Sequence, residues 1–171
     1  ESLESRPLSG HCLRPGPGRF FKLKDIAVMR VTIERTSFLK ALNHVQSVVE
    51  RRNTIPILSN VLLKATGAHL RLTATDLDIE IVETVGAEVA REGAATVPAH
   101  LLYDIVRKLP EGAQLELDQA GDGNRVSVIA GKSRFALQAL PPEDFPDLAS
   151  GDMTNTFSLS VDELKGLIEK T

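Results

Sequence analysis

Residues 30–50 read RVTIERTSFLKALNHVQSVVE, and this stretch decides the fold because its periodicity changes after five residues. Val31 and Ile33 alternate with polar residues, which predicts a half-buried strand over residues 30–34. Apolar side chains then recur at helical spacing, which predicts a helix over residues 36–50 with one apolar face. The residues of that face are Phe38, Leu39, Leu42, Val45, Val48 and Val49. A strand therefore leads directly into an amphipathic helix.

The sequence that follows repeats this order. After a loop at residues 51–56, segments rich in Val, Ile, Leu and Thr predict three strands, and then a second strand and helix begin. Pro98 suits the first turn of the second helix, and Pro110 ends it. The apolar face of that helix consists of Leu101, Leu102, Ile105, Val106 and Leu109. The predicted strands after the first helix span residues 57–65, 69–75, 77–89, 95–97, 114–118, 125–130 and 133–139.

A third strand and helix begin near the end of the chain. Residues 156–160 have a strand pattern, and Ser160 with Glu163 forms a capping-box motif before the next apolar stripe. The three starts share one spacing, because a strand residue is followed five positions later by a helix residue. These pairs are Ile33 with Phe38, Val97 with Leu102, and Leu159 with Leu164. Val97 lies 64 residues after Ile33, and Leu159 lies 62 after Val97, which indicates internal duplication.

These patterns predict an α+β fold and a division into domains. A duplicated β-α-β-β-β unit places two helices on one face of a continuous antiparallel sheet, since one unit cannot bury its own faces. We expect one domain over residues 29–140, a Pro-rich linker over residues 141–155, and the truncated start of another domain over residues 156–171. Residues 1–28 contain Pro-Gly steps without periodicity, and we interpret them as a disordered leader or a non-native extension.

Composition excludes several classes of protein. Cys12 is the only cysteine, so neither an intrachain disulfide framework nor a cysteine-based metal site is expected, as suits a cytoplasmic protein. No apolar run reaches the roughly 18 residues of a membrane helix, so we expect no membrane partner. The formal net charge of -3 means that any affinity for nucleic acid must come from the placement of charges.

The sequence offers little catalytic chemistry. The histidines are isolated, without a second ligand at metal spacing, and no phosphate-binding or dinucleotide-binding fingerprint occurs. Asp76 and Asp78 form the one suggestive pair, which could bind a metal or act as acid and base, as in a hydrolase or lyase. Asp76 could instead accept hydrogen bonds from turn amides, and we favour that interpretation. We predict that the protein is not an enzyme and has no catalytic residues, no metal and no cofactor.

The polar faces of the two predicted helices have few acids. The first carries Lys40, Asn43, His44 and Ser47, and Arg51 and Arg52 follow in the loop. The second carries His100, Tyr103, Asp104, Arg107 and Lys108. Such faces suit phosphate contacts without base readout, and they also suit ordinary solvated helices, so charge alone leaves both interpretations open.

Several motifs in order resemble those of the bacterial DNA polymerase III beta subunit, the sliding clamp. The segments that carry the resemblance are RNTIPILSN at 52–60, TDLDI at 75–79, VPA at 97–99, LP at 109–110, SRF at 133–135 and LPPEDFP at 140–146. Each motif is weak alone, and their order and spacing make the set specific. The resemblance covers residues 29–171, as the N-terminal domain plus the start of the middle domain, and leaves residues 1–28 unmatched.

The resemblance implies a fold and a function. Clamp subunits have three similar domains, and two subunits close head to tail into a homodimeric ring whose hole is lined by helices. Such a ring encircles double-stranded DNA without sequence preference and tethers the replicative polymerase, so it is a processivity factor in DNA replication that catalyses nothing. DNA polymerase III and the clamp loader would bind through domains mostly absent here. The alternative is a generic nucleic-acid-binding α+β module.

The resemblance also assigns site residues. Arg52 matches a loop arginine that touches DNA in the family, and His100 occupies a position where relatives can carry a basic residue that faces DNA. Lys40 and Arg107 join this predicted DNA-binding set by their helical phase. One predicted edge strand matches the strand that meets the second subunit in the family. Leu101, in the second predicted helix, replaces a polar residue that some relatives use at the same interface. The predicted dimer-interface residues are Lys132, Arg134, Phe135 and Leu137.

Overall fold

The computed structural model describes residues 29–50, 54–119, 121, 123–146 and 158–170. The predictions for residues 1–28, for Arg52 and for most of the linker lie outside these ranges. The helices and strands, in chain order, are β1 (Arg30–Glu34), α1 (Arg35–Val45), the 3-10 turn η1 (Pro56–Ser59), β2 (Asn60–Thr66), β3 (His69–Thr75), β4 (Glu80–Gly86), β5 (Glu88–Arg91), β6 (Gly93–Pro98), α2 (Ala99–Lys108), β7 (Gln114–Gln119), β8 (Arg125–Ala130), β9 (Ser133–Gln138), the 3-10 turn η2 (Pro142–Asp144) and α3 (Val161–Ile168).

The two repeated units exchange their first strands. In the described residues the strands form one antiparallel sheet in the order β5-β1-β7-β8-β9 and another in the order β4-β3-β2-β6. Strand β1 opens the first unit but pairs with β7 of the second, and β6 opens the second unit but pairs with β2 of the first. The registers correspond, because Ile33 pairs with Leu115 as Val97 pairs with Val61. Each unit therefore needs the other to complete its sheet.

The strands form two sheets where one continuous sheet was predicted. Between the two sheets, the described residues contain one isolated bridge, from Thr96 of β6 to Leu140 after β9. Pro141 and Pro142 follow Leu140 directly, and proline has no amide N–H to donate to a strand ladder. The pairing therefore cannot continue beyond the bridge in the direction of Pro142.

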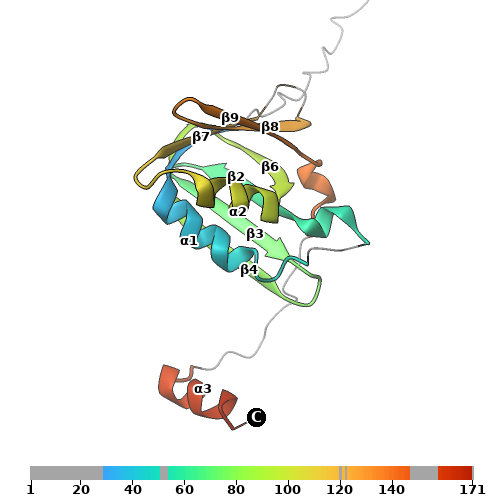
Figure 1. The fold of residues 1–171 in the computed structure, drawn as a ribbon. Helices are drawn as coiled ribbons and strands as arrows, with labels where there is room; N and C mark the ends of the chain where they lie inside the picture. The colour runs from blue at the N-terminus through green and yellow to red at the C-terminus, as the bar shows by residue number, and fades with distance from the viewer. Residues whose placement is uncertain (1–28, 51–53, 120, 122, 147–157, 171) are drawn as a thin grey trace, which may run out of the picture.

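Both repeated helices lie on the same side of the sheets (Figure 1). They cover one contiguous core, in which Phe38 and Leu42 of α1 and Leu102 and Val106 of α2 have no exposed side-chain surface. The strands contribute the other side of this core, and their fully buried leucines are Leu63, Leu70, Leu72, Leu115, Leu117 and Leu137. The apolar faces predicted for the first two helices thus supply most of the helical side of the core, except that Leu101 is half exposed and Val48 lies outside the core cluster.

Two predicted segments are interrupted by turns. The first helix was predicted to reach residue 50 but ends at Val45, because the amide and hydroxyl of Ser47 both donate to the carbonyl of His44 and tighten the chain into a turn. The strand predicted over residues 77–89 divides into β4 and β5 around Ala87. The Ala87 amide donates to Ala68 instead, where the chain passes from one sheet to the other.

Helix α3 is the last element of the described chain. Ser160 and Glu163 form the predicted capping box at its start. Residues 158–160 are not a strand, since a strand needs a bonded neighbour and no described strand pairs with them. The apolar residues of α3 remain largely exposed, with 80% of the surface of Val161 and 67% of that of Ile168 accessible.

Candidate nucleic-acid interface and sheet edge

Helix α1 begins at a charged cap. The carboxylate of Glu34 accepts hydrogen bonds from the backbone amides of Thr36 and Ser37, each at 2.8 Å. These two amides, Thr36 first, lower the pKa of Glu34 from 4.5 to about 2. The cap satisfies orphan donors at the helix N-terminus and fixes where the strand β1 becomes a helix.

The helices α1 and α2 lie antiparallel and are bonded at both ends. Arg35, the first residue of α1, donates from Nε to the carbonyl of Val106 at 3.2 Å and from Nη2 to that of Arg107 at 2.9 Å. At the other end, Nε2 of His100 in the first turn of α2 donates to the carbonyl of Val49 at 2.8 Å. These contacts hold the two helices side by side over the sheets.

Sequence reasoning missed the role of Arg35. A cation in the first turn of a helix opposes the dipole of that helix, so Arg35 is unfavourably placed for α1 alone. The same side chain lies at the C-terminus of α2, where a cation is favourable, and it bonds the carbonyls of Val106 and Arg107. The misplaced charge was the available signal that Arg35 serves a neighbouring element.

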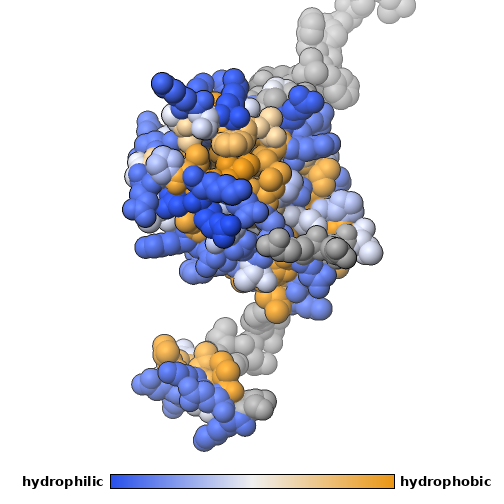
Figure 2. Space-filling model, in the orientation of Figure 1, coloured by the Kyte–Doolittle hydropathy of each residue, from blue (hydrophilic) through white to orange (hydrophobic). Residues whose placement is uncertain are grey.

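Lys40 and Arg107 are both exposed on the helices, as predicted. Lys40 makes no ion pair within the described residues. Arg107 lies 3.7 Å from Asp104 and 5.7 Å from the centre of the Tyr103 ring, in a cation–π contact that leaves its side chain 58% exposed. In Figure 2, drawn in the orientation of Figure 1, hydrophilic residues cover much of this side around an apolar patch.

The two histidines of this surface are already engaged. His100 is part-buried, and because Val49 offers only an acceptor, its Nε2 carries the proton. Its other nitrogen, Nδ1, is buried without a partner in the described part of the chain. His44 Nδ1 lies 2.8 Å from a carboxylate oxygen of Glu83 on β4. Neither ring is therefore a free cation on the helix surface, in contrast to Lys40.

The helix surface contrasts in charge with the chain as a whole. Helices α1 and α2 together carry four Lys or Arg residues and one acid, Asp104, whereas the complete sequence has a formal net charge of -3. Of the four cations, Arg35 is engaged with α2, and Lys40, Arg107 and Lys108 are exposed. The arrangement can attract phosphates but provides no rigid set of donors for reading bases.

Strand β9 forms an outer edge of its sheet, paired on one side with β8. Lys132, in the turn before it, and Arg134 are exposed, and Phe135 retains 38% of its surface. Leu137 is only 2% exposed, because it faces the core opposite Val126. The structure thus leaves three of the four predicted interface side chains accessible and commits that of Leu137 to the domain itself.

The paired carboxylates Asp76 and Asp78 lie in a turn. One carboxylate oxygen of Asp76 accepts from the amides of Ile79 at 2.7 Å and Asp78 at 3.0 Å, and these amides hold the pKa of Asp76 below its ordinary value. Leu77 between them has φ of 84°, a left-handed conformation typical of tight turns. This is the turn-amide interpretation that the sequence favoured.

The described residues contain neither a cluster of metal-binding side chains nor a membrane-spanning helix. No three His, Cys, Asp or Glu side chains gather there in a way that could hold a metal ion. None of the helices in the same ranges has the length and apolar character needed to cross a bilayer.

Comparisons with known proteins bear on this geometry. Residues 29–149 match the family described as DNA polymerase III beta subunit, N-terminal domain. The beta sliding clamp of Caulobacter vibrioides (strain NA1000 / CB15N) is 53% identical over 143 residues, which are 84% of this chain and 38% of that protein. The beta sliding clamp of Pseudomonas putida is 45% identical over 144 residues, covering 84% of this chain and 39% of the relative.

Solved structures agree with the sequence relatives. A crystal structure of the Caulobacter crescentus beta sliding clamp matches with a TM-score of 0.82 and 52% identity, over 85% of this chain and 39% of that one. A sliding clamp from Bartonella birtlesii, solved bound to griselimycin, matches with a TM-score of 0.77 and 47% identity, over 83% of this chain and 38% of that one.

The comparisons confirm the α+β clamp fold and the resemblance drawn from the sequence motifs. The chain spans less than two-fifths of the length of the curated relatives named above, so the match concerns one part of a longer architecture. This chain belongs to the DNA polymerase III beta subunit family, and residues 29–149 correspond to that family's N-terminal domain.

Proposed function

We propose that this chain is part of a ring-forming sliding clamp, which encircles duplex DNA and tethers the replicative DNA polymerase. In this role it is a cytoplasmic processivity factor that catalyses no reaction. The family match supports the proposal, since the relatives are named beta sliding clamps. DNA polymerase III and the clamp loader would act mainly through parts of the clamp other than the domain at residues 29–149.

The structural observation that adds to this family match is the charge contrast between the helices and the whole chain. A ring that slides must attract the phosphate backbone and must not favour one base sequence. Exposed cations on paired helices meet both conditions, because they attract phosphates at any sequence. Lys40 and Arg107 are the contacts that the structure supports best, with Lys108 beside them.

The other predicted DNA contacts have different support. Arg52 lies outside the described residues, so its assignment rests on the family motif at residues 52–60 alone. We assign His100 to holding the helix pair, because its Nε2 proton is already donated to Val49. In this clamp, residue 100 would hold the two helices together, whereas some relatives carry a basic residue that faces DNA at the same position.

We propose that β9 meets a second subunit in a head-to-tail homodimer. An edge strand has unpaired amides and carbonyls that can extend a sheet across an interface. Phe135 adds an apolar side chain at this edge, and Lys132 and Arg134 add charge. Leu137 would contribute through its backbone, since its side chain is buried. The exposed Leu101 of α2 is a further apolar candidate for this contact.

DNA binding by the chain tests the helix surface. We expect weak, sequence-independent binding to a fluorescein-labelled duplex, measured by anisotropy at several salt concentrations. The double variant K40E/R107E should lower the slope of log affinity against log salt by about 2, one for each lost phosphate contact. R125E controls for a single charge reversal, because Arg125 is exposed on β8 and carries no proposed DNA contact. An unchanged slope in K40E/R107E would contradict the proposed surface.

The same titration separates the clamp from the generic nucleic-acid-binding module. A module that acts by affinity should saturate tightly on short linear duplexes, whereas a clamp depends on enclosing the DNA. Tight, saturable binding by the isolated chain therefore favours the module and counts against the clamp.

A chimaera tests the sheet edge in a closed ring. Residues 29–146 would replace the corresponding segment of the Caulobacter vibrioides clamp, to which the chain is 53% identical. Light scattering after gel filtration should show a dimer, and F135E should shift it toward monomer. The control is T84E on β4, which makes the same charge change at an exposed position of the other sheet. A dimer unaffected by F135E would exclude this edge from the interface.

A further inference from the structure

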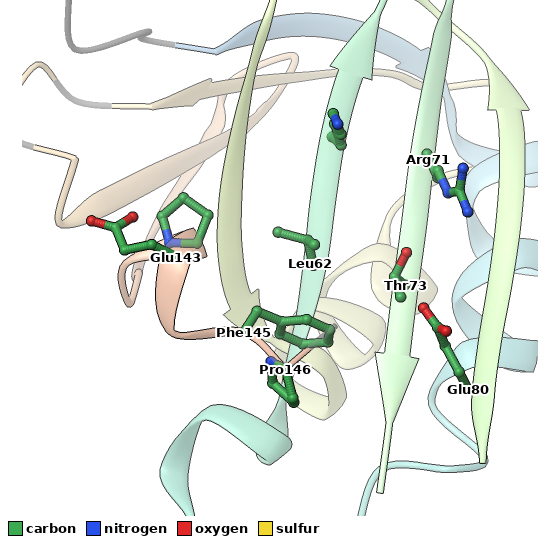
Figure 3. Close-up of a pocket in the computed structure, with 9 residues that line it drawn as sticks. Leu62, Arg71, Thr73, Glu80, Glu143, Phe145 and Pro146 are labelled. Carbon is green, nitrogen blue, oxygen red and sulfur yellow. The ribbon is translucent and has the colours of Figure 1, made fainter. Parts of the chain in front are cut away.

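The sheet β4-β3-β2-β6 has a second face, turned away from the helices. Alternation along the strands places Leu63 and Leu72 in the core and their neighbours Lys64 and Arg71 on the opposite face. The segment after β9 runs over one end of this face, where Phe145 is buried against it. Figure 3 shows the Phe145 ring beside Leu62, with Arg71 farther along the same face.

Two adjoining hollows form a groove on this face, defined by Leu62, Lys64, Thr66, His69, Arg71 and Phe145. One hollow, of about 380 Å³, has Leu62 and Phe145 among its walls. The other, of about 370 Å³, is lined by basic and hydroxyl side chains, including His69 and Thr66. Lys64 and Arg71 line both, so the two cations lie between the apolar contact of Leu62 with Phe145 and the polar end at His69.

Lys64 and Arg71 are placed at an energetic disadvantage. They lie directly opposite one another on adjacent antiparallel strands, where like charges repel. Within the described residues neither forms an ion pair with a carboxylate, although the sequence as a whole is acidic. A bound anion between them would offset this repulsion, because each cation would gain an opposite charge.

The other residues of the groove restrict the anion. Glu80 and Glu143 line the hollow that holds Leu62 and Phe145, and they would repel an extended polyanion such as duplex DNA. A peptide with one apolar side chain and a few carboxylates fits both ends: the apolar group beside Leu62 and Phe145, and the carboxylates beside Lys64 and Arg71. We propose that this groove binds an acidic peptide segment of a partner protein, on the face opposite the proposed DNA-facing helices.

Fluorescence anisotropy of the full chain tests the groove. The probe is a fluorescein-labelled peptide with one phenylalanine followed by four glutamates, and its matched partner has glutamines in place of the glutamates. We expect R71E and K64E each to weaken binding by about tenfold or more, the worth of one charge-assisted hydrogen bond. The glutamine peptide should bind about tenfold more weakly than the glutamate peptide.

The controls separate the groove from general charge effects and from misfolding. R125E makes the same charge change on the other sheet and should leave affinity for the peptide within about twofold. R71Q removes the charge without adding a carboxylate, so it should still weaken binding if R71E unfolds the chain. Equal peptide binding by R71Q and the parent protein would overturn the proposal. The proposal would also fail if the parent protein bound a labelled DNA duplex more tightly than the peptide and R71Q abolished that binding. The face would then be a nucleic-acid surface.

Discussion

Nε2 of His100 donates a hydrogen bond to the backbone carbonyl of Val49 over 2.8 Å, and so ties the start of α2 to the segment that follows α1. Arg35 makes the reciprocal connection, from the start of α1 to the last turn of α2. The two contacts follow the internal duplication, because each unit begins its helix beside the end of the other. The helix pair is thus fastened at both ends by side chains that periodicity alone assigns to the surface.

Replacing His100 with Ala should destabilise the domain. The change leaves the Val49 carbonyl without its donor, at a cost of about 1–2 kcal/mol in the free energy of unfolding. Urea unfolding followed by circular dichroism measures this cost. His44→Ala is the control, since the contact of His44 with Glu83 is largely exposed and should be worth less than about 1 kcal/mol. Equal costs for the two variants would argue against a structural role for His100.

Replacing Glu34 with Gln should reduce stability in a way that depends on pH. The pKa of Glu34 falls from 4.5 to about 2 on folding, so its ionised form is favoured in the folded state. That contribution is complete above about pH 4.5 and is lost as the pH falls toward about 2. Thermal melts should therefore show a lower Tm for E34Q at neutral pH, and a difference from the parent that shrinks in acid.

The control for this titration is E88Q, at an exposed position of β5 that caps no helix. Its Tm should follow that of the parent protein across the same range. A difference between E34Q and the parent that stays constant from neutral pH down to about pH 2.5 would show that the cap is not the charged group.

Periodicity predicted most of the fold because each unit has a clear alternation between strand and helix patterns. The strands Arg30–Glu34, His69–Thr75 and Arg125–Ala130 have the predicted bounds, and the repeat seen at Ile33 and Val97 corresponds to two units in the structure. The exchange of first strands was not predictable, because alternation specifies which face of a strand is buried but not its neighbour. The same limitation explains why one continuous sheet was expected.

The candidate site was predictable in part for a related reason. Helical phase placed Lys40 and Arg107 correctly on the exposed faces. It could not reveal that His100 would be covered, because the crossing of α2 against the end of α1 is a tertiary feature. Leu137 was assigned to an interface from its motif, and its burial follows from a strand register that the motif does not encode.

Two leucines at corresponding positions test the exchanged strands. Leu63 of β2 pairs with Ala95 of β6, and Leu117 of β7 pairs with Val31 of β1, so each lies where one unit completes the other. Both are fully buried, and replacing either with Ala should cost about 2–5 kcal/mol in urea unfolding. Leu101→Ala serves as the control, at half-exposed surface, and should cost less than about 1 kcal/mol. A small loss of stability for only one of these two leucine variants would mean that the two units are not equivalent in the core.

The hydroxyl of Thr96 should be the strongest single polar contribution to joining the two sheets. Its oxygen donates to the Leu140 carbonyl at 2.7 Å and accepts from the Leu140 amide at 3.1 Å and from Nδ2 of Asn60 at 3.3 Å. Thr96 is fully buried, and the proton and both lone pairs of its hydroxyl are used.

Thr96→Val keeps the shape and removes the hydroxyl, so the part-buried amide and carbonyl of Leu140 and the buried amide of Asn60 lose their hydrogen bonds to it. We expect a loss of about 2–3 kcal/mol in the free energy of unfolding. Thr96→Ser keeps the hydroxyl and removes one methyl group, and should cost only about 1 kcal/mol. Urea unfolding of both variants distinguishes packing from hydrogen bonding. Proline ends the strand ladder immediately beyond the bridge at Leu140, so this bridge has no neighbouring ladder bonds on that side to support it. If Thr96→Val cost no more stability than Thr96→Ser, the shape of the side chain and not its hydroxyl would hold the bridge.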